Sequence, residues 1–171
     1  MSELRTVTGT QLTNALFVLG VKFIMGGSYD DGVLHKNPVR LIVGLAESAD
    51  ARLRLSLIPL FLEHPEFSIY VPIALEKASG SARLTLQCYY SASVWLQKIH
   101  FEKLNSLKNT ITPLSDLFSK DLNMKPEDDP EINLVLLAKR HRELSHVQIN
   151  WLGTYKHAAQ VWMRGLELQN V

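Results

Sequence analysis

The chain has 171 residues, a size typical of a single globular domain. Its apolar share of 46% is enough to build a sizeable core, which excludes an intrinsically disordered chain. The 18 basic and 17 acidic residues leave a net charge of +1, so the chain as a whole does not attract nucleic acid or an anionic membrane.

The single cysteine, Cys88, excludes an internal disulfide and a cysteine metal cage. It lies in an apolar pattern, so we expect a buried and unreactive thiol, as a reducing compartment allows. The apolar stretch from Ala15 to Gly27 is too short to cross a bilayer and is interrupted by Lys22. It also lacks the cleavage site of a signal peptide. We therefore predict a soluble, cytoplasmic protein without a membrane segment.

Helical spacing of apolar residues predicts a first helix that begins at Thr10 and ends at Met25, before a glycine pair. Part of this region, residues 17–21, is rich in β-formers and could be a strand instead. Residues 28–36 contain turn signals and are predicted to form a loop.

Two capped helices are predicted next. Asn37 is a good N-cap for a helix over residues 38–49, and Asp50 for a helix over residues 51–63. The second helix is apolar around nearly its whole circumference, which indicates a central position in the core. Pro59 lies inside it and predicts a kink.

The middle of the chain is predicted to hold a short helix over residues 68–77 and a long helix over residues 82–106, separated by a Ser-Gly-Ser turn. Residues 109–129 are mixed and contain prolines, with one helical turn expected at residues 115–120.

The C-terminal region contains two helical patterns. Acidic residues around Pro130 indicate the start of a helix over residues 131–145. The last pattern places apolar residues at helical spacing from Trp151 to Leu166, with polar residues on the opposite face. The sequence leaves open whether these two segments form one continuous helix.

These elements predict an all-α fold, a compact bundle of about seven helices. A short irregular segment at the N-terminus is the alternative to a regular first helix. The whole chain, 1–171, is predicted to be one domain. We divide it into an N-terminal helix and loop (1–36), a central helical core (37–108), a proline-containing connector (109–130) and C-terminal helices (131–171).

One pair of residues suggests catalysis. Arg140 and His146 are separated by five residues, and His141 follows the arginine. This pattern resembles the Arg-x(4–6)-His motif of HEPN-type ribonucleases, which are helical bundles. The resemblance implies that His146 acts as general acid or base on ribose and that Arg140 holds the phosphate. The alternative is a solvated helix end whose basic residues complement the helix dipole.

A helix-turn-helix is the second hypothesis, over residues 71–97. It would direct Arg83, Gln87 and Ser91 toward DNA. The second helix is poor in positive charge and carries an apolar stripe, so an ordinary helical corner explains the pattern better.

Metal sites have little support in the sequence. The loop with Asp30, Asp31 and His35 and the segment from Glu63 to Glu66 do not place ligand pairs on one helical face. Glu143 and His146 have such a spacing, but no second copy exists. Phosphate-binding loops and nucleophile elbows are also missing from the sequence. We expect no metal and no cofactor.

The last helix carries Trp151, Tyr155 and Trp162 on one stripe. Tryptophan and tyrosine are enriched at the centres of protein interfaces, so these residues are candidates for contact with a partner or a second copy. Packing inside the core is the commoner explanation of such a stripe.

The segment from Ala51 to Gln97 contains the runs RLRLSLIPLFL and YYSASVWLQ. In these it resembles small helical bacterial proteins that accompany nucleotidyltransferases. The resemblance implies a partner class, in a nucleotidyltransferase or toxin–antitoxin type of system, and no site residue. The function expected from the sequence is a non-catalytic interaction module that acts as an oligomer or as a partner subunit. Ribonuclease activity and DNA binding are the alternatives, so nucleic acid is a less favoured partner.

Overall fold

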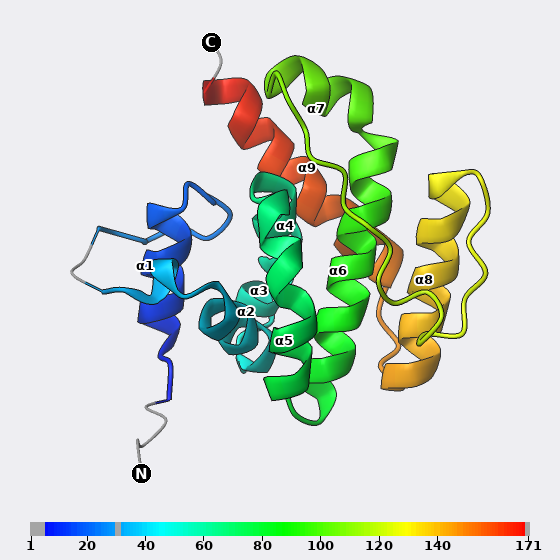
Figure 1. Ribbon diagram of the computed structural model, residues 1–171, viewed down its shortest axis with the longest axis horizontal. Coiled ribbons are helices and arrows are strands. Elements are labelled where there is room, and N and C mark those ends of the chain that lie inside the picture. Colours follow the sequence, from blue (N-terminus) through cyan, green and yellow to red (C-terminus); the bar gives the residue numbers. More distant parts are fainter. Residues whose placement is uncertain (1–5, 30–31, 170–171) are drawn as a thin grey trace.

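The computed structural model describes residues 6–29 and 32–169, which form α-helices, two 3₁₀-helices and connecting segments without a strand (Figure 1). The prediction of an all-α bundle is confirmed. In chain order the elements are α1 (Gly9–Val18), η1 (Leu34–Lys36), α2 (Pro38–Glu47), α3 (Ala51–Leu55), α4 (Leu57–Glu63), η2 (Pro65–Tyr70), α5 (Val71–Lys77), α6 (Ser81–Ile99), α7 (Phe101–Leu107), α8 (Pro130–Ser145) and α9 (Trp151–Gln169).

Helix α6 is the centre of the molecule. Ten consecutive residues, from Cys88 to Gln97, are buried, so this stretch of helix has no solvent-facing side. Helices α4 and α8 make the most extensive contacts with it, and α2 and α9 add smaller ones. Figure 1 shows α6 between α4 and α8, with α1 and α8 at opposite edges of the molecule.

The first helix is shorter than predicted. It begins after Thr8, not Thr10, because Thr8 and Gln11 form a capping box in which each side chain accepts a hydrogen bond from the other's backbone N–H. It ends at Val18 because Gly20 adopts a left-handed φ of 78°. The N–H groups of Gly20 and Val21 then bond back to the last helical turn in a Schellman motif. Residues 17–21 form this helix end instead of a strand.

Both predicted N-caps of the next helices are confirmed. The side chain of Asn37 accepts a hydrogen bond from the N–H of Arg40, and that of Asp50 accepts one from Arg52. The predicted 51–63 helix is broken at Ser56 into α3 and α4, one turn before Pro59. A proline ring lacks an N–H and collides with the carbonyl four residues earlier, which accounts for the position of the break.

The predicted long helix over residues 82–106 is also divided. It ends at Ile99, and α7 starts at Phe101 after His100 has left helical geometry. The chain contains no proline or glycine at this position, so local sequence gave no sign of the break. Upstream, the predicted short helix consists of two parts, the 3₁₀-helix η2 and the α-helix α5.

The connection from α7 to α8 crosses the face of α6 and is held there by buried hydrogen bonds. The amide of Gln97 donates to the carbonyl of Thr112 and accepts from the N–H of Leu114, at 2.9 and 2.7 Å. The hydroxyl of Tyr90 donates to the carbonyl of Ser115 at 2.7 Å. A bend and turns follow over residues 118–123, close to the helical turn predicted for 115–120.

Helices α8 and α9 are separate. Helix α8 ends at Ser145, and His146 adopts a left-handed conformation with a φ of 59°, which ends the helix and redirects the chain. None of the helices that the structure describes has the length and apolar character needed to span a bilayer.

The two hydrogen bonds between the Gln97 amide and the connection lead to a stability prediction. Replacing Gln97 with Met keeps the size of the side chain but leaves the buried N–H of Leu114 without its partner and removes the part-buried hydrogen bond to the Thr112 carbonyl, which costs about 2–3 kcal/mol in the free energy of unfolding. Urea denaturation measures this loss. The same substitution at the half-buried Gln87 on α6 is the matched control and is expected to cost less than about 1 kcal/mol. An equal loss in the free energy of unfolding for the two variants would show that the hydrogen bonds of Gln97 do not stabilise the fold.

Candidate functional site

Arg140 has a structural role within this chain. Its Nε donates a hydrogen bond to the carbonyl of Leu122 at 2.9 Å, and its Nη1 lies 2.6 Å from the carboxylate of Glu143. The contact with Leu122 holds the turn at residues 118–123 against α8. The guanidinium is therefore already engaged by groups that a phosphate would have to displace.

His146 lies just beyond the end of α8 and is exposed. The backbone between Arg140 and Ser145 is regular helix, in which six steps turn a side chain about 240° net from its starting direction. The structure therefore directs Arg140 toward Leu122 and leaves His146 in the connection to α9. Ribonuclease activity stays a prediction that needs a second copy of the chain to complete the pair.

The helix-turn-helix hypothesis places its recognition residues on the central helix. Ser91 is only 2% exposed, inside the core. Arg83 donates to the carbonyl of Leu75 at 2.6 Å and so joins α6 to α5. In this arrangement α6 does not present Ser91 to a DNA groove.

The three aromatic candidates of α9 pack within the chain. Tyr155 and Trp162 are buried, and Trp151 is partly buried. The indole N–H of Trp162 donates to the Glu63 carboxylate at 2.8 Å, and that of Trp151 donates to the carbonyl of Val147 at 3.2 Å. The stripe thus supplies core contacts, and the prediction that it meets a partner receives no support from its burial.

A buried histidine lies within this aromatic group. The ring of His141 stacks on that of Trp151 with centroids 3.5 Å apart, and Tyr89 and Tyr155 complete the cluster. Its Nδ1 lies 2.5 Å from the Tyr155 hydroxyl. Burial lowers the pKa of His141 to about 4 and raises the pKa of Tyr155 well above its ordinary range. At neutral pH the phenol and the imidazole are therefore both uncharged, and a hydrogen bond joins them.

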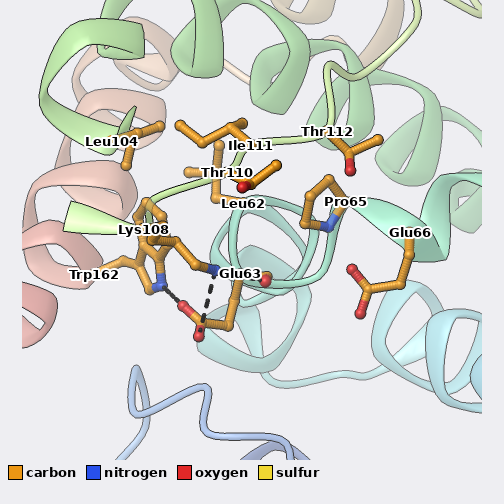
Figure 2. A pocket seen from close by; sticks show the side chains of 10 residues that line it. All are labelled: Leu62, Glu63, Pro65, Glu66, Leu104, Lys108, Thr110, Ile111, Thr112 and Trp162. Carbon is orange, nitrogen blue, oxygen red and sulfur yellow. Dashed lines mark hydrogen bonds and ion pairs between the residues drawn. The ribbon is translucent and has the colours of Figure 1, made fainter. Parts of the chain in front are cut away.

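Figure 2 shows a polar hollow between α4, α7 and α9. The Glu63 carboxylate is part of its lining, 3.6 Å from the ammonium of Lys108 and within hydrogen-bond distance of Trp162. Lys108 also donates to the carbonyl of Glu63 at 2.8 Å. The lining of the hollow also includes Thr110 and Thr112, two threonines of the connection that follows α7.

This hollow is small, and two of its three charged side chains, Glu63 and Lys108, are paired. Its volume is about 140 Å³, and a second hollow between α1, η1 and Arg40 measures about 210 Å³. Pockets for small molecules usually have volumes of about 300–1,000 Å³. The Glu63–Lys108–Trp162 contacts are thus best explained as a junction that joins α4 and α7 to the last helix.

The candidate metal segments are placed as follows. Asp30 and Asp31 lie outside the described residues. His64 contacts Glu66 through Nδ1 at 2.8 Å and the carbonyl of Leu19 through Nε2 at 2.6 Å, so both ring nitrogens have protein partners. Within residues 6–29 and 32–169, no three His, Cys, Asp or Glu side chains are grouped in a way that could hold a metal ion. Cys88 is buried as predicted, and burial raises its pKa to about 12.

The surface that sequence reasoning missed is on α8. The buried side of this helix consists of Asn133, Leu134, Leu137 and His141, whereas Ile132 and Val135 are 48% and 49% exposed. Three more exposed apolar side chains follow, at the end of α8 and in the connection to α9. We call the exposed side of α8 that holds Ile132 and Val135 the α8 surface; Leu144 lies about 180° round the helix from Val135, and Val147 and Ile149 lie beyond the helix end. Together these five side chains are five of the thirteen large hydrophobic side chains that are exposed among the described residues, within 18 residues of chain.

The sequence contained a signal for this surface. Ile132 and Val135 fall off the stripe formed by Leu134, Leu137 and His141, so a helical projection of residues 131–145 separates them from the buried side. The exposure of Val147 and Ile149 depends on the left-handed turn at His146 and could not be read from spacing.

Comparison with known proteins gave no match: no family model, no curated protein and no solved structure is similar to this chain.

The His141 cluster generates a pH prediction. The unfolded chain binds a proton at His141 near pH 6.5, whereas the folded chain binds it near pH 4. Between these values the unfolded state holds more protons, so the free energy of unfolding falls as the pH drops, by up to about 1.4 kcal/mol per pH unit. Urea denaturation between pH 7.5 and pH 4.5 measures this dependence.

In His141→Gln this part of the pH dependence is expected to disappear, because glutamine does not titrate. His157→Gln is the matched control, since His157 lies exposed on α9. A His141→Gln variant with the same pH dependence as the wild type would show that folding does not lower the pKa of His141.

Proposed function

We propose that this chain is a non-catalytic protein-interaction module and that it binds its partner through the α8 surface. The observation that carries the proposal is the exposure of two large apolar side chains, Ile132 and Val135, which are neighbours at i and i+3 on the outer side of α8. Exposed apolar side chains that lie together are a common feature of protein interfaces.

The placement of α8 supports the same proposal. One side of the helix packs against α6, the buried centre of the fold, and the helix stands at an edge of the molecule (Figure 1). A rigid helix with one side anchored in the core can present its other side to a partner without reorganisation, which reduces the entropic cost of binding.

Three groups that could take part in catalysis are engaged within the fold. Arg140 binds Leu122 and Glu143, Glu63 binds Lys108 and Trp162, and His141 binds Tyr155. All of these contacts except Arg140–Glu143, which lies within α8, join two elements of the chain. The contribution of these contacts to stability is enough to explain why the three side chains are present, and no substrate is needed to explain them.

Ile132→Lys tests the proposal. It places a charge in the apolar part of the α8 surface without disturbing the core, and burial of an isoleucine in an interface is worth about 1.5–3 kcal/mol, or roughly tenfold or more in affinity. The matched control is Ile73→Lys on α5, because Ile73 is 47% exposed against 48% for Ile132.

Two measurements give the readout. Light scattering after size exclusion reports self-association of the purified protein, and affinity purification of the tagged chain from its source cells reports other partners. We expect Ile132→Lys to weaken a complex that Ile73→Lys leaves intact. The proposal fails if both variants keep every complex of the wild type, or if the wild type forms none by either method.

A further inference from the structure

The exposed side of α8 has opposite charges at its two ends. Glu131, Ile132, Val135, Lys139 and Arg142 are all exposed and have the spacing i, i+1, i+4, i+8 and i+11, which places them on one face of a helix. The acidic end is Glu131, and the basic end is Lys139 and Arg142. The apolar residues lie between them and beside Glu131.

An ion pair within the chain offsets part of the charge at the acidic end. Glu131 is 3.4 Å from Lys156 of α9, yet its side chain remains 51% exposed. At the other end, Glu143 is the acidic neighbour of Arg142, and its carboxylate is bound to Arg140. The basic end therefore keeps its exposed positive charge, and the acidic end is extended by the exposed Asp128.

We propose that the partner of this face is a second copy of the chain, bound with the two α8 helices antiparallel. This inference rests on the proposed function and names the partner. A two-fold symmetric interface requires that residue i of one copy meets residue j of the other, and that j meets i. A face with opposite charges at its ends satisfies this condition only when the helices run in opposite directions.

The residue spacing sets the alignment. With the two-fold axis between residues 136 and 137, Glu131 of each copy lies opposite Arg142 of the other, and Val135 lies opposite Ala138. The two charge pairs are then about 16 Å apart, the length of eleven helical residues. In a parallel pair, Glu131 would face Glu131 and Arg142 would face Arg142, which like-charge repulsion disfavours. A nucleic acid fits the face poorly, because its phosphates would meet the acidic end.

A charge swap tests the pairing, with the dissociation constant measured by sedimentation equilibrium at low salt. Glu131→Arg and Arg142→Glu each replace two attractive contacts of the dimer by two repulsive ones, so we expect each to weaken the dimer about tenfold. The double variant Glu131→Arg/Arg142→Glu restores the opposite-charge pairs, and its dissociation constant is expected within about threefold of the wild type.

Glu76→Arg on α5 is the control, because Glu76 is equally an exposed helical glutamate but lies away from the face. Circular dichroism checks that each variant keeps its helical content. The proposal is overturned if the wild type stays monomeric up to about 1 mM, the weak end of measurable association, or if the double variant binds no better than the single ones. Loss of a different protein partner in Ile132→Lys would still support the proposed function, so the two failures can be told apart.

Cross-linking gives an independent measure of orientation. The native Cys88 is buried, so an introduced cysteine is the reactive thiol of the folded protein. Glu131→Cys and Arg142→Cys, mixed and treated with a short bismaleimide, are expected to give a mixed cross-linked dimer, whereas each variant alone gives little. Efficient cross-linking of each variant with itself indicates a parallel pair and overturns the antiparallel arrangement.

Discussion

The burial of α6 on every side is the constraint on which the rest of the structure depends. From Cys88 to Gln97 the helix has no exposed position, so other elements must cover its whole circumference. Helix α4 covers one side and α8 another, and the connection from α7 crosses a third. The polar groups enclosed in this process need partners inside the protein. Gln97 and Tyr90 find them in the backbone of that connection, which explains how a segment with little regular structure is held in place.

The same constraint determines what is left at the surface. Helix α8 covers α6 with one side only and is itself uncovered on the other. Its outer side combines apolar residues with charges of opposite sign, a composition suited to an interface. The aromatic residues of α9 are used differently, because the ring of Trp151 and the hydroxyl of Tyr155 enclose His141. In this fold the aromatic residues of α9 stabilise the core, whereas aliphatic residues of α8 form the α8 surface.

Local signals predicted much of the fold, and the errors have physical causes. The caps Asn37 and Asp50 act within three residues of chain, so spacing was enough to place them. The Thr8–Gln11 capping box is equally local, and it caps α1 ahead of the predicted start at Thr10. The break at His100 has no proline or glycine to mark it in the sequence. Site prediction had the same limit, because the exposure of Ile132 and the engagement of Arg140 by Leu122 both depend on which elements become neighbours.

The claim that α8 is the surface where a second copy binds is tested most directly by two-dimensional amide NMR of the wild-type protein during dilution. The account predicts concentration-dependent shifts at Glu131, Ile132, Val135, Lys139 and Arg142, with none at the equally exposed Ile73 on α5. A spectrum that does not change on dilution, or shifts confined to other helices, would contradict it.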